Sequence, residues 1–145
     1  MTSIHKSALV PYSAHEMFQL VADIESYSGF LPWCSRARIV SREQDVVVAA
    51  IDVAYSGVQK TFTTQNRLSA DKTMEMRLVS GPFSYLQGYW HFYPLEERAS
   101  KISLDLEFKF SNKLLDLALG SAFTKIANSM VDSFQQRAVE IYGKR

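Results

Sequence analysis

The middle of the chain alternates between hydrophobic and polar residues. In residues 102–110, ISLDLEFKF, every second residue from Ile102 to Phe110 is apolar, and Ser, Asp, Glu and Lys stand between them. Residues 46–55 and 74–79 show the same period, and turn-forming pairs such as those at 56–57 and 81–82 separate the runs. A period of two is typical of antiparallel strands that bury one face. It predicts about six strands between residues 37 and 110, and SALV near the N-terminus adds one more.

Helical patterns precede and follow this region. Residues 13–16, SAHE, form a capping-box motif that predicts a helix to about Ile24, and a further short turn is expected before Pro32. From Lys113 to about Tyr142 apolar residues recur every three or four positions, with Ser111 or Asn112 as the expected cap. A sheet with one apolar face needs a cover. We therefore predict a single α+β domain, residues 1–145, in which a curved antiparallel sheet of about seven strands wraps around the C-terminal helix.

The amino-acid composition argues against several classes of function. Sixteen basic and fifteen acidic residues give a net charge of +1, which argues against DNA binding by charge. One cysteine, Cys34, allows no internal disulfide, and three scattered histidines predict no metal site. No apolar run approaches the roughly 20 residues that cross a bilayer, so at most a peripheral membrane contact is expected. The N-terminus lacks signal and transit patterns, which predicts a cytoplasmic bacterial protein.

Three segments, YSGFLPWC (27–34), GPFSYLQGYWHF (81–92) and LDLEFKFSNKLL (104–115), carry a family resemblance. In this order and spacing they resemble the coenzyme Q-binding START-domain proteins of the polyketide cyclase superfamily, and within them a bacterial branch of ribosome association toxins. The resemblance implies a helix-grip (START/Bet v 1-like) fold. It also implies a cavity that binds ubiquinone or a similar prenylated lipid, with no covalent cofactor. For the toxin branch it implies binding to the large (50S) ribosomal subunit and a block of 70S formation.

Candidate cavity residues follow from strand parity and from the GFLPWC segment. Apolar side chains in a connection around Pro32 form either the rim of a ligand cavity or a plug that closes the core. Thr64 and Asn66 share a face with Phe62, so they either line the cavity or sit on a strand that twists into solvent. For the apolar candidates, ordinary core packing is the alternative. The candidates are Phe30, Leu31, Trp33, Phe62, Thr64, Asn66, Met76, Trp90, Phe108, Phe123 and Met130.

A second group of candidates is expected on the outer surface. Arg36, Arg38 and Arg42 share one strand parity and form either a solvated stripe or an RNA or phosphate contact. Tyr85 and Tyr89 face outward, as cross-strand packing partners or as a partner surface. His91, Asp105 and Glu107 have outward parity too, which leaves no acid–base pair in the cavity. We therefore predict a quinone carrier or chaperone that supports respiration, rather than a cyclase-type or aromatase-type enzyme. A ribosome-binding protein is the alternative.

Overall fold

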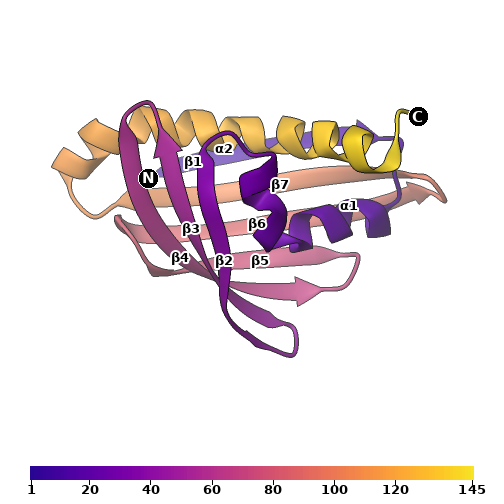
Figure 1. Ribbon diagram of the computed structural model, residues 1–145, viewed down its shortest axis with the longest axis horizontal. Coiled ribbons are helices and arrows are strands. Elements are labelled where there is room, and N and C mark those ends of the chain that lie inside the picture. Colours follow the sequence, from indigo (N-terminus) through magenta and orange to yellow (C-terminus); the bar gives the residue numbers. More distant parts are fainter.

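The computed structural model describes residues 1–145 as one sheet, two α-helices and a short 3₁₀ helix (Figure 1). All neighbouring strands are antiparallel, in the spatial order β1-β7-β6-β5-β4-β3-β2. The predicted α+β fold and the seven strands are confirmed. The elements are β1 (Thr2–Val10), α1 (Ala14–Ala22), η1 (Ile24–Gly29), β2 (Cys34–Glu43), β3 (Val46–Tyr55), β4 (Val58–Ser69), β5 (Thr73–Ser80), β6 (Phe83–Glu96), β7 (Ala99–Phe110) and α2 (Lys113–Tyr142).

The sheet buries one face under α2. On β7 the side chains of Ile102, Leu104, Leu106, Phe108 and Phe110 are all buried, as their alternation predicts. Figure 1 shows α2 lying along the sheet with its C-terminal end beside α1. Its buried residues are Leu119, Ile126, Ala127, Val131, Phe134 and Ala138. Two apolar clusters result: a large one under α1, η1 and the C-terminal half of α2, and a smaller one around Phe83 and Phe108.

The helix termini are capped as the sequence predicts. Ser13 Oγ accepts the Glu16 amide at 3.0 Å, and the Glu16 carboxylate accepts the Ser13 amide at 3.0 Å. Asn112, rather than Ser111, caps α2 by accepting the Leu115 amide at 2.8 Å. Neither α2 nor any other helix is long and apolar enough to cross a membrane.

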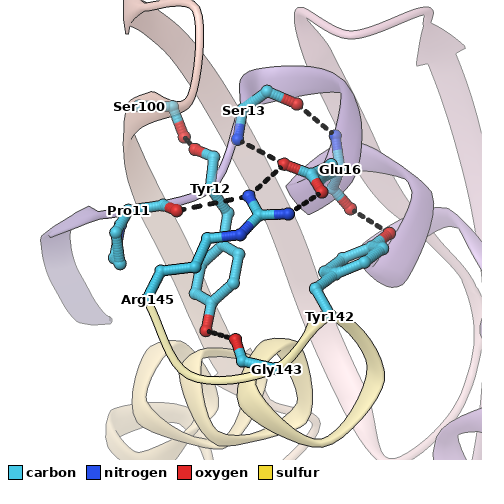
Figure 2. A network of polar contacts seen from close by, with 8 residues as sticks. All are labelled: Pro11, Tyr12, Ser13, Glu16, Ser100, Tyr142, Gly143 and Arg145. Atoms are coloured by element: carbon cyan, nitrogen blue, oxygen red, sulfur yellow. Dashed lines mark hydrogen bonds and ion pairs between the residues drawn. The ribbon is translucent and has the colours of Figure 1, made fainter.

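A polar network fixes the C-terminal end of α2 to the start of α1 (Figure 2). Arg145 donates to both carboxylate oxygens of Glu16 at 2.8 and 2.9 Å, and its guanidinium lies 4.9 Å from the centre of the Tyr12 ring. Tyr142 donates to the Glu16 carbonyl at 3.0 Å, and Tyr12 donates to the Gly143 carbonyl at 2.7 Å. The network joins residues more than 120 positions apart in sequence, so it closes the fold at this end of α2.

We expect this network to make stability depend on pH in the acidic range. The hydrogen bonds from Arg145, aided by the Ser13 amide and opposed by desolvation, lower the pKa of Glu16 from 4.5 to about 2. A folded pKa below the unfolded one gives stability that is complete above about pH 4.5 and is lost as the pH falls towards 2. Glu16→Gln should therefore cost about 1 kcal/mol at pH 7, a figure reduced for the partial solvent exposure of the pair. Urea unfolding at several pH values should show this difference shrinking below pH 4.5, and a pH-independent difference would contradict the assignment.

Candidate functional site

An internal cavity lies where the two apolar clusters meet, between α2 and the buried face of the sheet. Its volume is about 60 Å³, and apolar side chains form almost all of its wall. Strands β3 to β7, helices α2 and η1, and the segment before β2 each contribute side chains. The lining residues are Ile24, Tyr27, Trp33, Ala49, Ile51, Phe62, Thr64, Asn66, Met74, Met76, Leu86, Trp90, Leu104, Leu106, Phe123, Ile126, Ala127 and Met130.

Thr64 and Asn66 are the polar members of this wall. They are 5% and 1% exposed and lie opposite Ala49 and Val47 of β3, so the alternative of a strand that twists into solvent is wrong. Thr64 Oγ1 donates to Asn66 Oδ1 at 3.3 Å, and Asn66 Nδ2 donates to the carbonyls of Val47 and Thr64 at 3.1 and 3.3 Å. The protein itself thus satisfies both side-chain donors, as buried polar groups require.

No side chain in the cavity wall titrates near neutral pH. Tyr27, the one ionisable residue there, donates its hydroxyl to the Val21 carbonyl, and burial raises its pKa far above the ordinary value. Cys34 lies just outside the wall, and desolvation raises the pKa of its thiol to about 11, so it carries no thiolate at pH 7. No group of three or more His, Cys, Asp or Glu side chains is arranged to hold a metal ion. The wall is suited to binding apolar matter rather than to moving protons.

The GFLPWC segment divides its side chains between the cavity, the core and the surface. Trp33 lines the cavity and is 4% exposed, whereas Leu31 is 1% exposed and packs in the larger cluster. Phe30 is half-buried, with its ring 5.4 Å from that of Phe134 and 4.8 Å from the Arg137 guanidinium. Backbone hydrogen bonds from Leu31 to Tyr27 and from Ala54 to Trp33, both 2.8 Å, hold the segment in place. Leu31 and Trp33 are therefore buried, with Trp33 in the cavity wall, whereas Gly29 and Pro32 are exposed. The choice between a rim and a plug stays a prediction.

The structure brings eight of the eleven proposed cavity residues together in the wall. The other three, Phe30, Leu31 and Phe108, do not reach it. Phe108 has the inward parity that was predicted, but it packs against Phe123 at 4.7 Å and belongs to the smaller cluster nearer the N-terminal end of α2. Strand parity predicts that a side chain points between the sheet and α2. It does not predict whether that side chain lines the cavity or packs against a neighbouring aromatic ring.

Ten wall residues were not among the candidates. Ile24 and Tyr27 come from η1, a turn too short to show a periodic pattern. Ala49 and Ala127 are small residues whose size leaves the space open, which a search for bulky apolar side chains overlooks. The remaining six, Ile51, Met74, Leu86, Leu104, Leu106 and Ile126, share the inward parity or helix face of the named candidates, so parity could have found them.

The predicted basic stripe of three arginines is interrupted. Arg36 and Arg38 lie opposite Asp52 and Ala50 on the outer face, and Arg38 contacts the Asp52 carboxylate at 3.3 Å. A β-bulge between Ile39 and Ser41 changes the register, so Arg42 lies opposite the inward-facing Val47. One extra residue in a strand reverses the faces of all those that follow. The prediction that Arg42 lies on the same face as the other two arginines is therefore wrong. Arg42 instead borders a surface groove with Phe30 and Arg137.

The outer tyrosines form a continuous row on β6. Tyr85 donates to Gln87 at 2.6 Å, Gln87 donates to the Tyr89 hydroxyl at 3.3 Å, and the Tyr89 ring stacks on His91 at 5.9 Å. The stack continues from His91 to Tyr93, 5.6 Å away. These side chains support one another on the outer face of the sheet, and the cavity lies on the opposite face.

Comparison with known proteins places the chain in a family. The family model described as "Polyketide cyclase / dehydrase and lipid transport" matches residues 10–135. The "Ribosome association toxin RatA" of Escherichia coli (strain K12) is 46% identical over 145 residues, which cover 100% of this chain and 92% of that protein. The "Coenzyme Q-binding protein COQ10 homolog B, mitochondrial" of Xenopus laevis is 27% identical, over 97% of this chain and 59% of that one. A START superfamily protein from Mycobacterium smegmatis matches in structure with a TM-score of 0.82 at 18% identity, covering 96% of this chain and 98% of that one.

The fold is the START-like helix-grip fold, with a largely apolar cavity between the sheet and α2. The chain belongs to the polyketide cyclase/dehydrase and lipid transport family, and it is similar over its whole length to bacterial RatA proteins.

Proposed function

We propose that the cavity binds ubiquinone or a similar prenylated lipid and that the protein acts as a quinone carrier or chaperone that supports respiration. The single observation that carries the proposal is the cavity wall, in which every residue except Thr64 and Asn66 is hydrophobic. The family description names lipid transport, and the name of the Xenopus laevis relative specifies coenzyme Q binding. Without a titratable pair in the wall, binding is favoured over cyclase-type catalysis.

The ligand must enlarge the cavity when it enters. Ligand pockets usually measure about 300–1,000 Å³, whereas this cavity measures about 60 Å³. Met76 and Met130 lie in the wall and have flexible side chains that can change rotamer. Phe62 and Phe123, 6.1 Å apart, line both the cavity and a shallow depression beside it, so they separate the two spaces.

Movement of α2 would supply further room. Its first turns are loosely covered, since Leu114 and Leu117 are 77% and 81% exposed. Its last turn is fixed to α1 by the Glu16–Arg145 network of Figure 2. We therefore infer that the N-terminal half of α2 moves away from β4 during loading, with Phe62 and Phe123 parting at the entrance.

Lipid extraction and native mass spectrometry of freshly purified protein should detect a bound prenylated quinone. Gly88→Ala provides the matching loss of binding, because a Cβ there would lie 2.6 Å from Met76 Cε and 3.0 Å from Leu106 Cδ1. The methionine end is flexible and would be pushed into the cavity, so quinone affinity should fall by roughly tenfold, about 1.4 kcal/mol. Gly29→Ala is the control, since its Cβ would meet no atom within 4 Å. A wild-type protein that stays empty with quinones of several tail lengths would refute the proposal.

Association with the ribosome is the second candidate function. The observation that favours it is the 44–46% identity to several proteins named ribosome association toxin, over nearly the whole chain. Such binding would use surface side chains, with Arg36, Arg38, Tyr85 and Tyr89 as proposed contacts on the outer sheet face. The proposed location for either role is the bacterial cytoplasm, where ribosomes are found.

Co-sedimentation with purified ribosomal subunits tests this second function, and we expect the large subunit to be the one bound. Replacing Arg36 and Arg38 by alanine should weaken co-sedimentation and reduce its salt dependence if these side chains contact phosphates. Arg42→Ala is a matched control, because the bulge places this arginine on the other face. Unchanged binding of the double variant would exclude this pair of arginines, and Gly88→Ala should leave ribosome binding intact.

A further inference from the structure

Both tryptophans of the chain have an unpaired N–H group in the protein interior. Trp33 and Trp90 are 4% and 0% exposed, and both rings belong to the cavity wall. Their Nε1 atoms are the only buried side-chain nitrogen or oxygen atoms without a hydrogen-bond partner. A buried donor without an acceptor costs free energy, and native proteins contain few of them. Two such donors around one cavity require an explanation.

The free hydrogen-bond donors of the wall are the two indole N–H groups. The Thr64 hydroxyl, the Asn66 amide and the Tyr27 hydroxyl all donate to protein oxygens. An indole N–H only donates, so neither tryptophan can accept a hydrogen bond. Two donors therefore remain free, while the oxygens of Thr64, Asn66 and Tyr27 keep lone pairs that can accept. A ligand that pairs the two indoles needs acceptor oxygens.

We propose that Trp33 and Trp90 donate hydrogen bonds to acceptor oxygens at the polar end of the bound lipid. The inference rests on the proposed function and specifies it further: the ring of a quinone has carbonyl and ether oxygens that accept hydrogen bonds, whereas a hydrocarbon leaves both indoles unpaired. Both Nε1 atoms are shielded in the present conformation, so side chains of the wall must rearrange around the ligand before its acceptors reach them.

Nuclear magnetic resonance of protein labelled with ¹⁵N at the indole nitrogens tests this inference directly. The chain has two tryptophans and hence two indole N–H signals, which Trp33→Phe and Trp90→Phe assign. The full chain is titrated with an oxidised short-tail ubiquinone and with an isoprenoid hydrocarbon of the same tail length. We expect the oxidised quinone to move at least one indole proton signal downfield, which the hydrocarbon does not do. We also expect the quinone to bind about tenfold more tightly than the hydrocarbon.

The variants give a second readout. Each Trp→Phe change removes a donor and keeps an aromatic ring, so the preference for quinone over hydrocarbon should decrease while hydrocarbon binding persists. If a variant fails to fold, the ligand series on the wild-type protein still decides. Equal indole shifts with quinone and hydrocarbon would overturn the assignment of the tryptophans and leave lipid binding in place. Absence of binding by both ligands would overturn both proposals.

Discussion

Replacing Leu106 by aspartate is expected to unfold the protein or to lower its stability by about 3–5 kcal/mol. Leu106 is 6% exposed and lies on the inward face of β7, between Ile4 of β1 and Gly88 of β6. An aspartate there would place an unpaired carboxylate between the sheet and α2, where no basic side chain lines the cavity. Since small domains are stable by about 5–15 kcal/mol, this loss is a large part of the total.

Circular dichroism and thermal melting of the purified variants measure this effect. Lys109→Asp introduces the same side chain on the same strand, at an exposed position of opposite parity, and should change stability by about 0.5 kcal/mol or less. Leu106→Ala separates the cost of the charge from the cost of lost volume. If Leu106→Asp melted like the wild type, the packing of β7 against α2 would be incorrect.

The elements whose patterns are long and regular were predictable from the sequence. Nine residues of strict alternation place β7 and its buried face, and the helical repeat from Lys113 to Tyr142 gives α2 with its observed bounds. Repetition makes these predictions robust, since one atypical residue does not change the period. The capping box at Ser13 was equally specific, because it needs only two side chains at a fixed spacing.

Local departures from regularity were not predictable. Nothing in the residues 38–42, RIVSR, indicates which one is the extra residue of the bulge, yet that residue decides the face on which Arg42 lies. Ile141 continues the apolar repeat of α2 but is 50% exposed and borders the same surface groove as Phe30 and Arg42. Strand parity and helix period describe one element at a time, whereas these outcomes depend on how neighbouring elements pack or shift.

The candidate site was predictable only as a set of inward-facing residues. Parity identified Phe62, Met76 and Trp90, and the structure places them in the wall. A cavity, however, is defined by the side chains that fail to fill a space, and here small residues such as Ala49 and Ala127 contribute to it. The hydrogen-bond state of the two indoles is likewise a property of the packed interior, since any tryptophan in a sequence could be paired or unpaired.

Trp33→Ala is expected to lower the free energy of unfolding by about 3 kcal/mol, the lower limit of the usual cost of removing a buried tryptophan side chain. The ring is 4% exposed within the larger cluster, so its removal leaves a void that the surrounding core fills only in part. Two features reduce the cost: the ring already adjoins a cavity, and its unpaired N–H is removed with it. For a domain of this size the melting temperature should fall by about 10 °C.

Pro32→Ala is the neighbouring control, since Pro32 is exposed and its ring contributes no core packing. If the segment were a mobile rim, Trp33→Ala would weaken quinone binding and leave the melting temperature almost unchanged. The structure predicts that Trp33→Ala lowers the quinone affinity and the melting temperature together, because the same ring packs in the core and lines the cavity. In a Trp90→Phe background the remaining fluorescence comes from Trp33 alone, and quinone should quench it. Quenching of Trp33, together with no large loss of stability in Trp33→Ala, would support the mobile-rim interpretation. Loss of stability with unchanged quinone affinity would limit Trp33 to a packing role.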